Sequence, residues 1–236
     1  MLLAGLQKNT LIDFPGKISC IVFTLGCNFR CNYCYNPTLV IHERFPKELL
    51  KEEDFFKFLE ERKGLLDGVV ITGGEPTLHK DLNLFIKKIK DLGFAVKLDT
   101  QGSSPIFLEA ILKEGNVDYI AMDIKSPIEK YKEITNSHFD PNLILSSIKI
   151  IMDYAKENKN FDYEFRTTIV AGDLDKNDFE KIGKMIKGAS KYYLQEFRPE
   201  EDLNNKEYSK RQGYSESEMK ELKEIMEKYI EKVYIR

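Results

Sequence analysis

The chain has 236 residues, of which 42% are hydrophobic and 32% are charged, and its formal net charge is −3. This length is sufficient for one domain with a full hydrophobic core. The acidic balance argues against a nucleic-acid partner, and no apolar run reaches the ~18–20 residues that span a bilayer. The N-terminus lacks the features of a signal peptide, so we expect a cytoplasmic protein without a membrane partner.

Short apolar runs alternate with amphipathic charged stretches, which is typical of β-then-α units around a parallel sheet. A lead-in over residues 1–16 is expected to hold a short edge strand within 10–16. Strands are predicted over residues 18–25, 68–72, 95–99, 119–124, 163–170 and 191–197. Helices are predicted over residues 47–63, 81–92, 104–114, 128–135, 141–158 and 176–187.

Residues 200–236 are predicted to form a C-terminal helical extension, with a helix over 215–231 and a last strand over 232–235. Six β-then-α units are too few for a closed eight-unit barrel, which needs about 250 residues. We therefore predict an α/β fold, a partial, open TIM-like (β/α)6 barrel of parallel strands, forming a single domain over residues 1–236. A doubly wound flat sheet is the alternative.

Three of the four cysteines lie in the loop that directly follows the first predicted parallel strand. Cys27, Cys31 and Cys34 have the spacing C-x3-C-x2-C. Three thiolates do not complete the four-ligand set of a structural zinc ion or of a [4Fe–4S] cluster, so one iron of a cluster would stay open. His42 could complete a zinc site, although zinc sites favour C-x2-C pairs. Cys20, in mid-strand, is predicted to be a small buried apolar residue.

This motif, with an aromatic residue directly before its last cysteine, resembles the signature of the radical S-adenosylmethionine (SAM) enzymes. The resemblance implies a [4Fe–4S] cluster held by Cys27, Cys31 and Cys34, with the amino and carboxylate groups of SAM on the open iron. It also implies that Tyr33, Cys34 and Tyr35 lie against SAM, and Tyr33 is a candidate wall for the adenine.

The next strand ends in Gly73, Gly74 and Glu75, followed by a proline. Two glycines allow a close approach of the backbone and positive φ angles, and the segment is at least a strand-to-helix turn. It also resembles the Gly-Gly-Glu-Pro motif that holds the amino group of SAM in radical SAM enzymes. All three residues are therefore candidate SAM ligands.

The following strand ends in Asp99 and Thr100, within Asp-Thr-Gln-Gly. This segment resembles the Asp-Thr-Asn-Gly of glycyl-radical-enzyme activases, from which Gln101 departs, and a helix-capping loop is the alternative. The resemblance makes Asp99 and Thr100 candidate SAM-binding residues. Whether a monovalent cation sits near Asp99 and Asp123 is left open.

Charged side chains also lie at the ends of the next two strands. Asp123 and Lys125 project to one side of their strand, either as an ion pair or, as in the activases, toward the ribose and carboxylate of SAM, with Ile124 between them as a further SAM-site residue. Arg166 needs a partner in its apolar strand. That partner is either Glu164 on the same side or, as the resemblance implies, the SAM carboxylate.

The last strand ends in a segment that resembles the Leu-Gln-x-Phe-Arg-Pro of activases linked to anaerobic ribonucleotide reductase, and it makes Gln195 and Phe197 candidate adenosine contacts. His42, His79 and His138 lie in polar contexts and are predicted to be solvent-exposed.

The resemblance implies an enzyme that reductively cleaves SAM and installs a glycyl radical on a partner, with anaerobic ribonucleotide reductase as the expected one. The chain has no large substrate-binding domain, which favours a protein substrate. No second cluster or flavin motif is present, so flavodoxin or ferredoxin is expected as external electron donor. The alternatives are a pyruvate formate-lyase activase, a radical SAM enzyme for a small molecule such as a deazapurine synthase, and a zinc-stabilised binding module.

Overall fold

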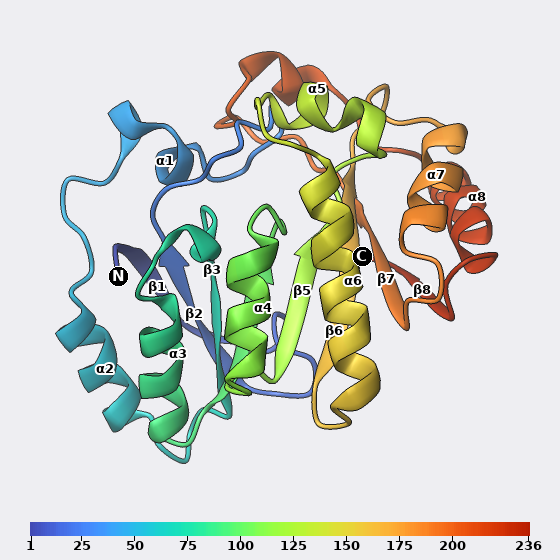
Figure 1. Cartoon of the computed structure of the whole chain (residues 1–236). Coiled ribbons are helices and arrows are strands. Elements are labelled where there is room, and N and C mark those ends of the chain that lie inside the picture. Colours follow the sequence, from blue (N-terminus) through green and yellow to red (C-terminus); the bar gives the residue numbers. More distant parts are fainter.

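The computed structural model describes all 236 residues, and its strands form one eight-stranded sheet in sequential order (Figure 1). The first two strands pair antiparallel, and every later neighbour pairs parallel. The strands are β1 (Leu3–Thr10), β2 (Ser19–Thr24), β3 (Gly68–Gly73), β4 (Ala95–Thr100), β5 (Tyr119–Asp123), β6 (Asp162–Ile169), β7 (Lys191–Glu196) and β8 (Lys232–Ile235).

The connections between the parallel strands carry the helices. These are α1 (Pro37–Val40), α2 (Glu52–Glu61), α3 (Leu82–Asp91), α4 (Pro105–Lys113), α5 (Tyr131–Thr135), α6 (Asn142–Glu157), α7 (Lys176–Met185) and α8 (Glu216–Glu227). Short 3₁₀ helices span His42–Arg44, Pro76–Leu78, Ile128–Lys130 and Lys206–Lys210. No helix has both the length and the apolar character needed to cross a membrane.

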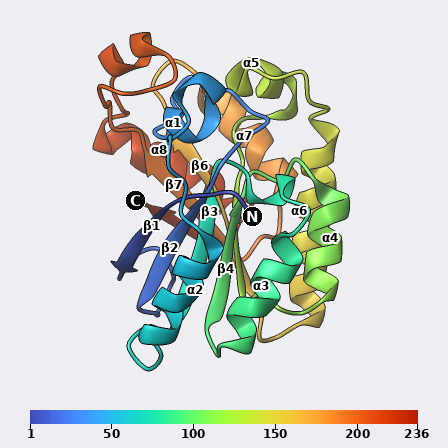
Figure 2. The ribbon, with the colours of Figure 1, turned by 90° about the vertical axis from the view of Figure 1, so that its left-hand side faces the viewer.

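The arrangement of strands and helices confirms the open barrel. Figures 1 and 2 show α2, α3, α4 and α6 together on one face of the sheet. A doubly wound sheet reverses its strand order at a switch point, whereas here the order runs from β1 to β8 without reversal. The two edge strands, β1 and β8, do not pair with each other, so the barrel stays open on one side.

Hydrophobic periodicity explains how the helices attach to the sheet. Leu82, Phe85, Ile86 and Ile89 recur at helical spacing along α3, and all four are buried. Strands β2, β3 and β5 are buried over most of their length, as their near-continuous apolar runs predict for parallel strands that are covered on both faces. Cys20 in β2 is fully buried within this core, as predicted.

The N-terminal third differs most from the sequence prediction. The edge strand was expected within 10–16 but spans Leu3–Thr10, because the hydroxyl of Thr10 bonds Asp13 and the chain turns there. The helix expected from residue 47 begins at Glu52, because the Leu50 amide donates to the Leu3 carbonyl at 2.9 Å and keeps the preceding segment extended. Helix α1 was not predicted.

The C-terminal part is more than a helical extension. Helix α8 and the last strand occur where they were predicted, and Ser215 begins the helix with a capping box that it forms with Glu218. Strand β8 pairs in parallel with β7, however, so residues 232–235 complete the sheet instead of lying outside it.

The turn after β1 directs Phe14 into the barrel. Phe14 is 2% exposed and packs with Ile21, Val70 and Tyr119 near the N-terminal ends of the strands. Replacing it with alanine should lower the free energy of unfolding by about 3–4 kcal/mol, because burial is lost and a cavity remains. Urea unfolding measures this loss. Leu11→Ala, in the same turn at a position that is 73% exposed, should change stability by less than about 0.5 kcal/mol.

Candidate active site

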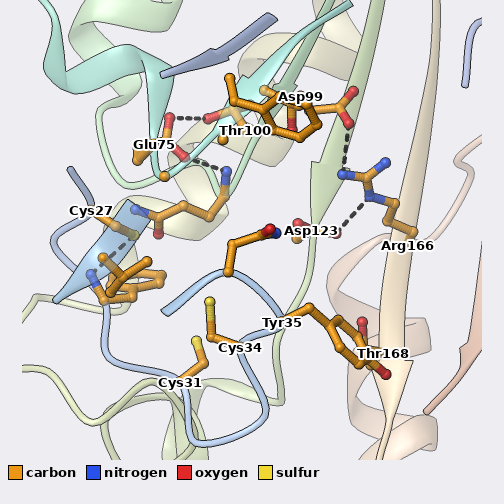
Figure 3. Close-up of a pocket in the computed structure, with 18 of the residues that line it drawn as sticks. Cys27, Cys31, Cys34, Tyr35, Glu75, Asp99, Thr100, Asp123, Arg166 and Thr168 are labelled. Atoms are coloured by element: carbon orange, nitrogen blue, oxygen red, sulfur yellow. Dashed lines mark hydrogen bonds and ion pairs between the residues drawn. The ribbon is translucent and has the colours of Figure 1, made fainter. Parts of the chain in front are cut away.

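The C-terminal ends of the parallel strands surround a cavity of about 570 Å³, which Figure 3 shows with part of its lining. This volume is typical of a small-molecule site. Fourteen predicted site residues line it, namely Cys27, Cys31, Tyr33, Cys34, Tyr35, Gly73, Gly74, Glu75, Asp99, Thr100, Asp123, Lys125, Arg166 and Gln195.

Two predicted site residues do not line the cavity. Ile124 is fully buried, and its amide donates to the carbonyl of Arg166 at 2.8 Å. Phe197 is also buried and stacks on Tyr35, with 5.9 Å between the ring centroids. Phe197 therefore supports a residue of the cavity wall, while Ile124 joins two of the strands that carry the site.

The cysteine loop is fastened at its tip. Phe29, between the first two site cysteines, is buried against Tyr131 and Phe139, with ring centroids 6.2 and 5.1 Å away. The amide of Arg30 donates to the carbonyl of Thr135 at 2.8 Å. Aromatic packing and a main-chain bond thus join the loop to the segment that contains α5.

The two glycines after β3 let that strand approach the start of the cysteine loop. Gly73 has φ +121°, and a Cβ at Gly74 would lie 2.0 Å from the carbonyl oxygen of Gly26. The Gly74 amide donates to Thr24 at 2.9 Å, and the Glu75 amide donates to Gly26 at 2.8 Å. The close backbone approach that the two glycines predicted therefore brings the end of β3 against the backbone of Thr24 and Gly26.

Glu75 is only 1% exposed, and its side chain joins the segment after β3 to the end of β4. Its carboxylate accepts from the amide of Thr77 (3.1 Å), the hydroxyl of Thr100 (2.7 Å) and the amide of Gln101 (2.8 Å). Burial raises the pKa of Glu75, and these donors offset only part of that rise. The side chains of Glu75 and Thr100 thus fix the strand ends relative to each other.

An alternating chain of charges crosses the site from β4 to β5 through a residue of β6. Asp99 pairs with Lys97 (2.6 Å) and with Arg166 (3.0 Å). Asp123 pairs with Arg166 (2.6 Å) and with Lys125 (3.2 Å). Figure 3 shows the guanidinium between the two carboxylates. The sequence left open whether a monovalent cation sits near Asp99 and Asp123, and in the structure the guanidinium of Arg166 pairs with both carboxylates.

The same contacts show that Glu164, one of the two partners considered for Arg166, is not bonded to it. Glu164 accepts instead from the hydroxyl of Tyr119 at 2.8 Å, and Arg166 binds the two aspartates. Burial disfavours the charged carboxylates, but Arg166 together with one lysine, Lys97 beside Asp99 and Lys125 beside Asp123, outweighs it and lowers the pKa of both aspartates. The aspartates are therefore ionised at neutral pH.

Arg166→Leu should remove about 2 kcal/mol from the free energy of unfolding at pH 7. The loss leaves Asp99 and Asp123 each with one lysine, so it falls below the 3–5 kcal/mol typical of an isolated buried charge. The stabilisation from a carboxyl with a lowered pKa exists above its unfolded pKa of about 3.9 and is lost as the pH falls. The difference between variant and parent in urea unfolding should accordingly shrink below about pH 4. Arg198→Leu, whose side chain is 81% exposed, serves as control and should change little.

The three site thiols lie in a different environment from the charges. Burial raises the pKa of Cys27 to about 12 and of Cys31 to about 11, and it raises the pKa of Cys34 as well. The metal-free thiols are therefore protonated at neutral pH. Binding of iron or zinc must release these protons, since thiolates are the metal ligands.

The donor set fits an iron–sulfur cluster better than zinc. A tetrahedral zinc ion needs sulfur atoms about 4 Å apart, and no three Cys, His, Asp or Glu side chains gather in that way. A multi-iron cluster distributes its cysteines over several irons, so their sulfur atoms lie further apart than around one zinc ion, and all three thiols line the cavity. His42 is exposed, and its ring lies 5.2 Å from that of Phe45, outside the cavity.

Two residues that line the cavity, Gln101 and Thr168, were not among the predicted site residues. Gln101 is buried at the cavity, and its side-chain amide donates to Asn28 (2.5 Å) and to Ser103 (2.9 Å). Thr168 also lines the cavity, and its spacing of two from Arg166 along a strand could have revealed it. His79 was predicted to be solvent-exposed, and this was wrong. The residue is half-buried, and its Nε2 lies 3.0 Å from the carbonyl oxygen of Leu25.

Comparison with known proteins identifies the family. The sequence profile of the radical SAM superfamily matches residues 21–186, which include the cysteine loop, most of β2 and the whole of β3, β4, β5 and β6. The chain belongs to the radical SAM superfamily. The radical SAM family implies a [4Fe–4S] cluster and SAM as cofactors.

Relatives narrow the family to the activating enzymes. The chain is 37% identical to a protein of Methanocaldococcus jannaschii assigned as a glycyl-radical enzyme activating enzyme, over all of this chain and 95% of the relative. It is 32% identical to the pyruvate formate-lyase-activating enzyme of Clostridium pasteurianum, over 87% of this chain and 84% of that enzyme. This radical SAM enzyme is therefore a member of the glycyl-radical-enzyme activase family.

Solved structures share the fold. Streptococcus suis SuiB matches with a TM-score of 0.64 at 14% identity, covering 92% of this chain and 48% of SuiB. A domain of a pyruvate-formate lyase-activating enzyme from Bacteroides vulgatus matches with a TM-score of 0.54 at 21% identity, covering 72% of this chain and 98% of that domain.

Proposed function

We propose that this activase installs a glycyl radical on an anaerobic ribonucleotide reductase. The observation that carries the proposal is the position of the Leu-Gln-Glu-Phe-Arg-Pro segment in the structure. The sequence of this segment resembles the corresponding segment of the reductase activases. Gln195 lines the cavity, Phe197 stacks on Tyr35, and the amide of Arg198 donates to the Tyr35 hydroxyl at 2.9 Å. The segment that suggests the reductase subtype is thus built against the cysteine loop.

The cavity residues divide between two cofactors in this proposal. Cys27, Cys31 and Cys34 hold the [4Fe–4S] cluster. When bound, the cluster supplies the low-potential electron that cleaves SAM to methionine and a 5′-deoxyadenosyl radical, which removes hydrogen from the partner.

Polar and charged groups then orient SAM. Lys125 and the N–H groups of Arg166 that the aspartates leave free would bind its carboxylate, for which a guanidinium fork is suited. The backbone of Gly73–Glu75 receives its amino group.

The remaining lining residues form the nucleoside side of the pocket. Asp99, Thr100 and Asp123 offer oxygen acceptors for the ribose hydroxyls and the sulfonium side of SAM, and Tyr33, Tyr35 and Gln195 contact the adenosine. Phe197 and Ile124 do not line the cavity and instead support its lining residues, Phe197 by stacking on Tyr35 and Ile124 by bonding the backbone of Arg166.

The electron is proposed to come from an external protein such as flavodoxin or ferredoxin. The one cysteine outside the site is Cys20, which is fully buried in β2 and does not line the cavity. No second set of cysteine ligands is therefore present to hold a relay cluster.

Electron paramagnetic resonance tests the choice of partner. The reconstituted, reduced enzyme is mixed anaerobically with SAM and either an anaerobic ribonucleotide reductase or a pyruvate formate-lyase, the second candidate because of the Clostridium relative. A glycyl doublet with the reductase alone is expected. A doublet with pyruvate formate-lyase alone would assign the chain to that partner, and SAM cleavage without any doublet would favour a small-molecule substrate.

A further inference from the structure

Residues 198–211 leave β7 and cross the cysteine loop before the chain reaches α8, and we call this segment the strap. Figure 1 shows it in orange-red at the same end of the barrel as α1 and α5. Leu203 and Tyr208 are buried and anchor the strap in the core, although most of its other side chains are exposed or half-buried.

The strap bonds the main chain of the cysteine loop at two consecutive residues. The side-chain amide of Asn204 donates to the carbonyl of Cys31 at 2.9 Å. The same carbonyl accepts from the amide of Cys34 at 3.1 Å, which closes the turn between these two cysteines. The amide of Asn205 donates to the carbonyl of Asn32 at 3.0 Å.

The far end of the strap is itself fixed. The hydroxyl of Tyr208 donates to Asp173 at 3.1 Å, and it accepts from the side chain of Asn32 at 3.4 Å. The guanidinium of Arg211 lies over the Tyr208 ring, 4.0 Å from its centroid, and forms an ion pair with Asp173. Asn204 is therefore presented to the cysteine turn by an anchored segment.

We propose that the strap holds the turn between Cys31 and Cys34 in its cluster-binding shape before any iron arrives, with Asn204 as the positioning residue. The metal-free thiols have no ligand to order them, and fixing the backbone of one residue costs about 1–2 kcal/mol. A turn already ordered by the protein avoids this cost when the cluster binds. The inference goes beyond the proposed function, because it concerns the metal-free chain and holds for any substrate.

Asn204→Asp tests the positioning role at nearly constant size. The substitution replaces the amide donor with an acceptor that faces the carbonyl of Cys31. In the metal-free full-length chain, hydrogen–deuterium exchange in peptides covering residues 27–36 should become roughly tenfold faster, while peptides from α3 and α4 keep the exchange of the parent chain. After anaerobic loading, a chelator should bleach the cluster absorbance roughly tenfold faster.

Glu201→Gln, on the same strap at an exposed position, is the matched control and should leave both rates unchanged. Unchanged exchange over 27–36 in Asn204→Asp would overturn the proposal, and so would faster exchange spread over all helices and strands. A failure of the proposed function is distinguishable from either result, because it would remove the glycyl signal of the unsubstituted enzyme without altering exchange in its metal-free form.

Discussion

Cys31→Ala is expected to yield a folded protein that is colourless after anaerobic reconstitution with iron and sulfide. Two thiols cannot hold a cluster that needs three cysteines, so the visible absorbance should be lost. SAM cleavage should fall to the level of a protein-free blank. The fold should survive, because replacing a cysteine by alanine deletes a single buried sulfur atom, and circular dichroism checks this.

Cys20→Ala is the matched control for this experiment. Cys20 is as deeply buried as any residue of the chain, but it lies in β2 outside the cavity. The control should keep the brown colour and SAM cleavage of the parent enzyme. A parent protein that binds one zinc ion per chain and shows no visible absorbance after iron and sulfide treatment would contradict the cluster.

Gly74→Ala should destabilise the chain by about 3 kcal/mol and should also abolish cluster binding. The added Cβ would meet the backbone carbonyl of Gly26 at 2.0 Å, and backbone cannot move aside as the end of a side chain can. Overpacking typically costs about 1–3 kcal/mol of stability, and we expect a clash with backbone to cost an amount near the upper end of this range. The displaced residue precedes Cys27, so the first cysteine must shift with it.

Gly5→Ala provides the comparison for Gly74→Ala. Gly5 lies in β1 with no heavy atom within 4 Å of the position that a Cβ would take, and its φ is not positive. Urea unfolding and cluster absorbance should both match the parent. A Gly74→Ala protein with parental stability and a full cluster would show that β3 and the cysteine loop need not approach so closely.

The sequence was sufficient to predict the fold because periodicity and strand-end motifs agree. Apolar runs located the parallel strands, and parallel strands end at the same edge, so Glu75, Asp99, Asp123 and Arg166 were bound to lie near the cysteine loop. Element boundaries near the N-terminus failed for a local reason. The Leu50 amide bonds the carbonyl of Leu3, a pairing over 47 residues that no local pattern contains.

Other features depend on side-chain geometry that spacing does not encode. Alternation placed Asp123 and Lys125 together but could not show that Arg166 would join Asp99 and Asp123 and leave Glu164 to Tyr119. The position of the strap was even harder to predict from the sequence, since residues 198–211 have no helical or strand periodicity. The role proposed for it rests on single hydrogen bonds to main-chain atoms of the loop, made across more than 170 residues.

The proposed installation of a glycyl radical can be followed through the hydrogen atom that the partner loses. An anaerobic ribonucleotide reductase labelled with dideuterated glycine is incubated with the reduced enzyme and SAM, and the 5′-deoxyadenosine product is examined by mass spectrometry. Deuterium is expected in the deoxyadenosine, together with the glycyl radical signal. Unlabelled deoxyadenosine formed without a glycyl signal would contradict the proposal.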